Sequence, residues 1–341
     1  MGNSKDDFYE VGQASAVNVD PPANRIQSFE ADALSVRMFD VGKGEAILVE
    51  VPTGETMLVD GGSTTGEKRN RILADVIAPY IREGSLTAFL ATHPHVDHVG
   101  AIRYLLEYHR DRLANGVTFY YNGKPPRNPD ATWWSELNDA INDAGVRRVA
   151  VDQLIYPAPP PLGRLAVVAL YSGPLGPNEY RSVFMHLSYG QAQFLFTGDA
   201  YCAYENKLAR DYAAKGVLRA HVLKVTHHGS QDGTSRALVQ EAGPRIAFAS
   251  TYYDQRAKEQ DHAWERVAKR RLPGCRKIET FLHGDIDIRT DGQPSGAGVL
   301  FQARTRYPGR LAAPLGLPLT RPRSYTATAA TTDKACTNQL P

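Results

Sequence analysis

The chain has 341 residues, which suits one large two-sheet domain with extensions as well as two separate domains. Hydrophobic residues are 42% and charged residues 22% of the chain, so a sizeable core can form. Lysine and arginine number 39 against 37 aspartate and glutamate residues, a formal net charge of +2 that excludes a strongly polybasic nucleic-acid binder, although not a local basic groove.

Several features of the sequence predict a cytoplasmic protein without a membrane span. The three cysteines are too few and too scattered for a disulfide framework or a cysteine-based zinc site, which favours a reducing compartment. No apolar run approaches the roughly 20 residues that a membrane-spanning helix needs. The N-terminal sequence MGNSKDDFYE lacks the apolar core of a signal peptide.

Both ends of the chain differ in composition from its centre. Residues 1–33 are polar and contain Pro21 and Pro22, whereas residues 304–341 are rich in proline, alanine and threonine without periodicity. We therefore expect an N-terminal arm over 1–33, one folded domain over 34–303, and a poorly ordered C-terminal tail over 304–341.

Three short apolar runs open the central region and are separated by turns that contain glycine, which predicts an antiparallel meander. A helical pattern and a further apolar strand follow, and this strand ends directly on the sequence THPHVDHVG. The runs of the meander cover residues 35–41, 45–51 and 56–62, the helix covers 69–81 and the strand covers 86–92.

The middle of the chain has a less regular pattern, with a predicted helix at 101–110, a strand at 117–122 and an amphipathic segment at 133–145. Trp133 and Trp134 either line the rim of a substrate cleft or pack against the core. Packing is the favoured interpretation, because aromatic residues at the start of a helix are more often buried.

The second half of the central region again alternates strand and helix patterns. Together with the meander, this order predicts an α+β fold in which two mixed β-sheets pack face to face with helices outside. We predict a hairpin at 181–200, strands at 221–226, 245–250, 277–284 and 286–292, and helices at 205–216, 234–243 and 262–272.

The sequence THPHVDHVG places His93, His95, Asp97 and His98 on one short loop. Imidazole nitrogens and carboxylate oxygens are ligands of Zn²⁺ and related first-row ions, and these four residues offer two ligands to each of two ions. A solvated polar loop is the alternative, but the spacing H-x-H-x-D-H rarely arises by chance.

Two further predicted strands end on residues of the same kind. FLFTGDA delivers Asp199 to a strand end after a glycine, and VLKVTHHGS ends on His227 and His228. A carboxylate in the place of Asp199 can bridge two cations. Three strand ends that carry metal ligands predict one site at one edge of the sheets.

These motifs together resemble the metallo-β-lactamase superfamily, and in particular the branch that contains the hydrolase domain of ComEC competence proteins and phosphorylcholine esterase. The likeness covers residues 34–303 and includes FDVGKGEAILVEVP, MLVDGG, LKVTHHGS and FLHGDIDIRTDG. It implies that this region is one hydrolase domain with the αββα sandwich of the superfamily. The segment at about 110–175 has no counterpart in the branch and is expected to be an insertion that determines specificity.

The resemblance also implies which residues bind metal. His93 and His95 would bind a first ion, Asp97 and His98 a second, and Asp199 would bridge the two. Two divalent cations are therefore expected, with Zn²⁺ as the favoured metal and Mn²⁺ as the alternative.

Further roles follow from the same resemblance. Asp60 would accept a hydrogen bond that orients the histidine loop. One of His227 and His228 would complete the metal site or donate a proton to the leaving group, and the other could contact a phosphate oxygen. Asp97, His227 and His228 are thus the candidate catalytic residues.

One histidine of the superfamily pattern has no clear match in this chain. Many members have a first-metal histidine between the histidine loop and the bridging aspartate, where this sequence offers only His109, on a predicted surface helix, and His186, within a predicted strand. His262 is a candidate second-metal ligand at the start of its predicted helix. His283 is expected to have a structural role.

The implied activity is hydrolysis by a hydroxide held between two metal ions, without a protein nucleophile. Ser230, Thr234 and Ser235 precede a predicted helix whose N-terminal amides suit a phosphate, although Thr234 or Ser235 could simply cap that helix. A phosphodiester, in a nucleic acid or a small molecule, is therefore the expected substrate, and the sequence does not identify a partner protein. Hydrolysis of a lactam, lactone or thioester on the same metals, and a non-catalytic scaffold, are the alternatives.

Overall fold

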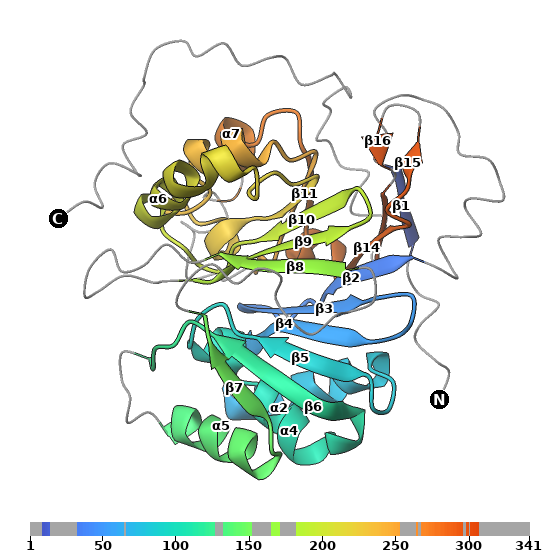
Figure 1. Cartoon of the computed structure of the whole chain (residues 1–341), viewed down its shortest axis with the longest axis vertical. Helices are drawn as coiled ribbons and strands as arrows, with labels where there is room; N and C mark the ends of the chain where they lie inside the picture. Colours follow the sequence, from blue (N-terminus) through green and yellow to red (C-terminus); the bar gives the residue numbers. More distant parts are fainter. Residues whose placement is uncertain are drawn as a thin grey trace.

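Parallel and antiparallel strands are combined in each of two sheets, which face each other with helices on the outside (Figure 1). This arrangement confirms the predicted α+β fold. The computed structural model describes residues 9–13, 33–64, 66–126, 132–151, 165–170, 182–252, 264, 267–295, 298–299 and 301–306.

The larger sheet continues the predicted meander on both sides. Its neighbouring strands are antiparallel in its first part and parallel in its last part, with the change at the fourth strand of the chain. Within the described residues, the strand order is β1 (Tyr9–Gln13), β17 (Gln302–Thr305), β14 (Ile286–Thr290), β2 (Leu34–Met38), β3 (Gly44–Glu50), β4 (Thr56–Ser63), β5 (Leu86–Leu90), β6 (Leu113–Tyr121) and β7 (Arg147–Ala150).

The smaller sheet contains the predicted hairpin and the strands that follow it. Its hairpin side is antiparallel and its other side is parallel. The order, for the residues the structure describes, is β13 (Arg276–Glu279), β12 (Ile246–Ala249), β11 (Val222–Lys224), β10 (Ala192–Phe196), β9 (Phe184–Tyr189) and β8 (Leu165–Leu170), and β15 (Pro294–Ser295) pairs separately with β16 (Gly298–Val299).

Helices form the two outer layers, one beside each sheet (Figure 1). Short helical turns connect several strands to the segments that follow them. The larger sheet is covered by α2 (Glu67–Ile77), α4 (Ile102–Tyr108) and α5 (Thr132–Asp143), the smaller sheet by α6 (Cys202–Tyr212) and α7 (Arg236–Ala242), and the short turns are α3 (Val96–Val99), α9 (Thr280–His283), η2 (Ala78–Tyr80), η3 (Arg110–Arg112), η4 (Ala213–Lys215) and η5 (Thr226–Gly229).

Strand β3 shows why the sandwich has an apolar layer on each side of the larger sheet. Ile47 and Val49 point into the cluster between the two sheets, whereas Ala46 and Leu48 point into the cluster beneath the outer helices. Successive side chains of a strand alternate between faces, so the unbroken apolar run over residues 46–49 must be covered on both faces. On α2, Leu73, Ala74 and Ile77 cover it from outside.

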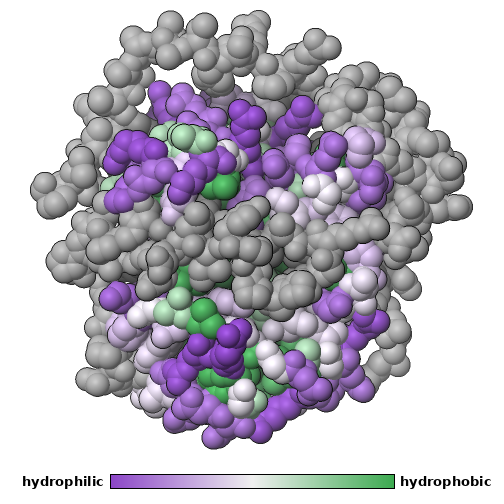
Figure 2. All heavy atoms as spheres, in the orientation of Figure 1, coloured by the Kyte–Doolittle hydropathy of each residue, from purple (hydrophilic) through white to green (hydrophobic). Residues whose placement is uncertain are grey.

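The surface of both layers is mixed in character. Figure 2 shows hydrophilic side chains spread over the helical layers and hydrophobic ones in smaller areas. Trp133 and Trp134 pack against the cluster beneath the outer helices, which confirms the packing interpretation. In the part of the chain that the structure describes, no helix combines the length and apolar character needed to cross a membrane.

The observed elements differ from the predicted ones in two places. The strand predicted over 277–284 ends at Glu279 and continues as the helical turn α9. Strand β1 lies within the expected N-terminal arm and pairs with β17, which itself runs to Thr305, past the expected end of the domain. Within the helix predicted over 262–272, residues 264 and 267–271 are helical, and residues 262, 263, 265 and 266 lie outside the described residues.

Candidate metal centre

The two sheets meet at the edge where the predicted ligands lie. The amide of Val183, before β9, donates to the carbonyl of Thr92, after β5, at 2.8 Å. The hydroxyl of Ser250, after β12, donates to the carbonyl of Gly44 in β3 at 2.6 Å. Because parallel neighbours end at the same edge of a sheet, the loops after β5, β10 and β11 are brought together here.

Asp60 is the extra residue of a β-bulge in β4. Ala46 pairs with Gly61 and Ile47 with Val59, which leaves Asp60 unpaired, with a φ of 54°. A bulge redirects the side chain of its extra residue. The Asp60 carboxylate therefore turns towards the histidine loop.

That carboxylate holds the loop through three hydrogen bonds. Its Oδ1 accepts from the Thr92 amide, and its Oδ2 accepts from the Thr92 hydroxyl and from Nδ1 of His98, each at 2.8 Å. Because Nδ1 of His98 is held in this way, its Nε2 is directed at Asp199. Asp60 thus lies where a residue that orients His98 should lie.

His93 and His95 face each other on the same loop. The Thr92 hydroxyl, already a donor to Asp60, lies 3.1 Å from Nδ1 of His93, and Nε2 of His93 lies 3.0 Å from Nδ1 of His95. Burial and the nearby His98 lower the pKa of His93 well below its usual value. A neutral imidazole is the form that binds metal.

Asp199 follows β10 and is surrounded by three imidazole rings. Its Oδ2 lies 3.1 Å from Nε2 of His98, 3.4 Å from Nε2 of His228 and 3.9 Å from Nε2 of His227. Burial alone would raise the pKa of this carboxyl, but the three histidines lower it well below its usual range. The side chain is therefore an ionised carboxylate in the midst of nitrogen ligands.

His227 and His228 reach Asp199 through an uncommon backbone conformation. Their φ angles of 50° and 52° lie in the left-handed region, which non-glycine residues rarely adopt and which tends to occur at functional sites. Nδ1 of His227 lies 2.9 Å from Oδ1 of Asp232, and Nδ1 of His228 lies 3.2 Å from the carbonyl of Ser250. Both rings therefore present Nε2 to Asp199.

The buried donor atoms fit a divalent cation. Asp97, His98, Asp199 and His228 each offer one atom, and these atoms lie within 4.8 Å of one another. Among the described residues, Nε2 of His98, Nε2 of His228 and Oδ1 of Asp199 are buried without a hydrogen-bond partner. A buried nitrogen or oxygen atom without a partner costs free energy of folding, and a bound cation would accept its lone pair. A mixed set of imidazole and carboxylate ligands suits a first-row metal.

The predicted phosphate site at Thr234 and Ser235 is wrong. Both residues are buried, and their amides donate to the carboxylate of Glu205 from α6, Thr234 at 2.7 Å. The amides are therefore already paired with a side chain of the protein itself. Ser235 does cap α7, since its hydroxyl accepts from the Leu238 amide at 3.2 Å. Ser230 lies nearer the site, where it donates to Asp232.

The remaining histidines lie away from the centre or outside the described residues. Nε2 of His186 donates to the carbonyl of Arg219 at 2.8 Å, and His109 pairs with Asp75 near the surface. Nδ1 of His283 lies 2.8 Å from the carbonyl of Glu279, in keeping with a structural role. His262 belongs to the residues that the structure does not describe.

The sequence interpretation missed several residues that hold the ligands. Thr92, Asp232 and Ser250 are ordinary polar residues in loops, and nothing in their local sequence marks them. Glu45 and Lys224 carried a signal, because each is a charged residue within an apolar run that forms a buried strand. A buried charge needs a partner.

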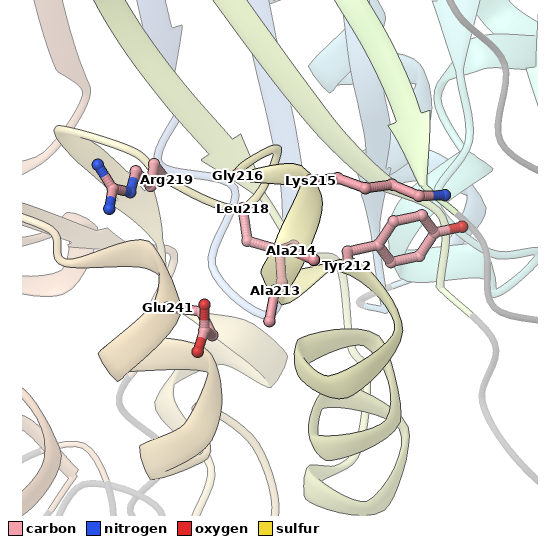
Figure 3. Close-up of a pocket in the computed structure, with 8 residues that line it drawn as sticks. All are labelled: Tyr212, Ala213, Ala214, Lys215, Gly216, Leu218, Arg219 and Glu241. Carbon is pink, nitrogen blue, oxygen red and sulfur yellow. The ribbon is translucent and has the colours of Figure 1, made fainter.

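A cavity with a volume of about 320 Å³ lies elsewhere, between the C-terminal end of α6 and α7 (Figure 3). Its lining contains none of the predicted site residues, so it is separate from the metal centre. It is lined by Tyr212, Ala213, Ala214, Lys215, Gly216, Leu218, Arg219 and Glu241.

Comparison with known proteins gives a family match and one curated relative. The family model described as the metallo-beta-lactamase superfamily matches residues 40–163, which include Asp60 and the histidine loop. ComE operon protein 3 of Bacillus subtilis (strain 168) is 26% identical over 275 residues. The match covers 74% of this chain but 33% of that protein, so the chain spans about a third of the length of its relative.

Two solved structures of bacterial proteins have a similar course of the chain. The metallo-beta-lactamase fold protein YhfI from Bacillus subtilis has 14% identity and a TM-score of 0.46, over 72% of this chain and 95% of that one. CmlA, a diiron beta-hydroxylase from Streptomyces venezuelae, has 15% identity and a TM-score of 0.48, over 74% of this chain and 53% of that one.

The family match and the ComE relative agree with the motifs that the sequence carries. The matched residues supply the bulge aspartate and the whole histidine loop, and the second sheet adds Asp199 and the histidine pair at the same edge. Residues 40–163 are therefore similar to the metallo-beta-lactamase superfamily, and most of the chain is similar to ComE operon protein 3.

Proposed function

We propose that the protein is a metal-dependent hydrolase of the phosphodiesterase or nuclease type. The observation that carries this proposal is the convergence of Asp97, His98, Asp199 and His228 beside the facing pair of His93 and His95. Two groups of ligands that share one carboxylate suit two cations.

The ligands divide between two metals as follows in our proposal. His93 and His95 would hold one ion, Asp97, His98 and His228 the other, with Asp199 between them. Zn²⁺ is the metal we expect and Mn²⁺ the alternative, and His262 stays a candidate additional ligand. Two divalent cations supply hydroxide from water at neutral pH and stabilise negative charge on the attacked and leaving oxygens.

His227 is the residue we propose as proton donor to the leaving group. Its side chain is 29% exposed against 10% for His228, so it is the better placed of the two to meet a substrate. Asp232 holds its Nδ1 and thereby fixes the direction of Nε2. The more deeply buried His228 is then the ligand.

A phosphodiester, in a nucleic acid or a small molecule, is the substrate class that we propose. The resemblance to the ComEC-like branch supports it, together with the suitability of paired cations for an anionic ester. Lactams, lactones and thioesters use the same chemistry and are therefore tested beside it.

The test is hydrolysis of bis-p-nitrophenyl phosphate, a chromogenic β-lactam and a lactone by protein reconstituted with Zn²⁺ or Mn²⁺. We expect metal-dependent cleavage of the diester that Asp199→Asn abolishes and that the surface variant His109→Gln retains. Cleavage of the lactam or lactone alone would replace the phosphodiester by that class. No turnover with either metal would favour a non-catalytic scaffold.

A further inference from the structure

An ion pair lies buried directly behind the metal centre. The ammonium of Lys224, in β11, contacts Oε2 of Glu45, in β3, and neither side chain is exposed to solvent. The pair therefore joins the smaller sheet to the larger one. A buried ion pair rarely stabilises a fold better than apolar residues of the same size, so its other contacts indicate what it does.

Lys224 is directed at the strand end that carries Asp199. Its Nζ donates to the carbonyl of Gly198 at 3.1 Å and lies 3.9 Å from Oδ1 of Asp199. An ammonium has three N–H donors, and the contacts with Glu45 and Gly198 leave one for the direction of Asp199. Oδ1 of Asp199 has no hydrogen-bond partner among the described residues, and the ammonium of Lys224 lies 3.9 Å from it.

Glu45 balances the charge of that ammonium. One of its oxygens lies within 4.8 Å of ligand atoms of Asp60 and His98, a grouping that could itself suggest a metal site. Lys224 already supplies a positive charge at this carboxylate, so a further cation is not needed. The pair is neutral as a whole and leaves the negative charge of Asp199 available.

We propose that Glu45 and Lys224 are positioning residues of the metal centre: Lys224 fixes the backbone and carboxylate of Asp199, and Glu45 cancels the charge of Lys224 so that it does not repel the metals. This inference rests on the proposed metal-dependent function. It extends the centre to a layer between the two sheets that touches neither metal nor substrate.

The first variant is Glu45→Gln, which keeps the shape of the side chain and removes its charge. The uncompensated ammonium then faces the cations, and we expect affinity for Zn²⁺, measured by competition with a chromogenic chelator, to fall about 10- to 100-fold. Glu45→Asp keeps the charge and should recover most of this loss. Equal affinity of Glu45→Gln and the unaltered protein would overturn the proposal.

The second variant adds Lys224→Met to Glu45→Gln. Removal of both charges leaves no uncompensated charge in this layer, so the Zn²⁺ affinity of the double variant should be higher than that of Glu45→Gln. The difference in affinity that remains from the unaltered protein measures how much Lys224 contributes by positioning Asp199. A double variant that binds Zn²⁺ as weakly as Glu45→Gln would overturn the role of charge balance. Because it buries no unpaired charge, it is also the variant expected to fold if Glu45→Gln does not.

Arg37→Met is the matched control. Arg37 pairs with the buried Asp287 at 3.2 Å and joins β2 to β14, and β3 separates β2 from the strand of Asp60, so its loss should lower thermal stability in chelator but leave Zn²⁺ affinity unchanged. An equal loss of affinity in this variant would mean that general destabilisation explains the effect. Binding of Zn²⁺ without diester cleavage would contradict the proposed substrate alone, whereas failure of the unaltered protein to bind metal would overturn both proposals.

Discussion

Gly198 allows Asp199 to approach the histidine loop closely. Its φ is +53°, and a Cβ atom here would lie 2.6 Å from Oγ1 of Thr92 and 2.8 Å from Oγ of Ser182. Thr92 donates to Asp60 and Ser182 accepts from the amide of Asp199, so both neighbours are fixed. The glycine is thus needed for its conformation and for its lack of a side chain.

A comparison of two glycines separates these two needs. Gly216 also has a left-handed conformation, with a φ of +65°, but a Cβ atom there meets nothing within 4 Å. Gly216→Ala should therefore lower the free energy of unfolding by only about 1 kcal/mol. Gly198→Ala should cost about 1–3 kcal/mol more, because Thr92 or Ser182 must move. Urea denaturation of both variants tests this, and equal losses would show that the site tolerates the added methyl group.

Asp232 offers a test of the proposed proton donor that leaves the ligands untouched. Asp232→Asn weakens the hold on Nδ1 of His227, 2.9 Å away, and should lower kcat about 10- to 100-fold with an unchanged metal content. Steady-state kinetics and elemental analysis provide the two measurements. An unchanged kcat would assign the proton transfer to another group, with His228 as the first candidate.

Among the elements, β2 and β14 are joined by a buried cluster of charge. Asp287 in β14 accepts from the Ser35 hydroxyl at 2.7 Å, from Arg37 at 3.2 Å and from Arg289 at 2.8 Å. Burial alone would raise the pKa of Asp287, but the two arginines and the serine lower it below its usual range. The ionised carboxylate is therefore the form that the fold stabilises.

The sign of the pH dependence follows from that lowered pKa. The stabilisation by Asp287 is complete above the pKa of an unfolded aspartate, about 3.9, and is lost as the pH falls through the lower pKa of the folded state. Asp287→Asn should reduce the free energy of unfolding by about 3 kcal/mol at pH 7, and the difference should shrink below about pH 4. Urea denaturation from pH 7 to pH 3 measures both, and a difference that is constant over this range would contradict the assignment.

At the scale of the whole molecule, the features that depend on local sequence patterns were predicted better than the contacts between residues distant in the sequence. The order of the strand and helix patterns sufficed for the sandwich, and the strand ends with histidine and aspartate indicated where the ligands gather. The contact of Ser250 with Gly44 joins residues 206 positions apart, and no local pattern encodes such a pair. The phosphate interpretation of Thr234 and Ser235 failed for the same reason, since Glu205, which occupies their amides, belongs to another helix.

The metal centre lies across the seam between the sheets, so metal binding should stabilise the whole fold. Asp60 and His98 come from the larger sheet and Asp199 and His228 from the smaller one, and a cation between them links the two. At a metal concentration of 100 times Kd, binding adds about 2.7 kcal/mol, which corresponds to roughly 5 °C or more in Tm. Removal of metal with a chelator should lower the Tm by that amount in calorimetry, and Zn²⁺ should restore it. Asp199→Asn should unfold at the same temperature with or without chelator, because the carboxylate that the two halves of the site share is lost. A Tm that the chelator changes equally in both proteins would place the stabilising metal elsewhere.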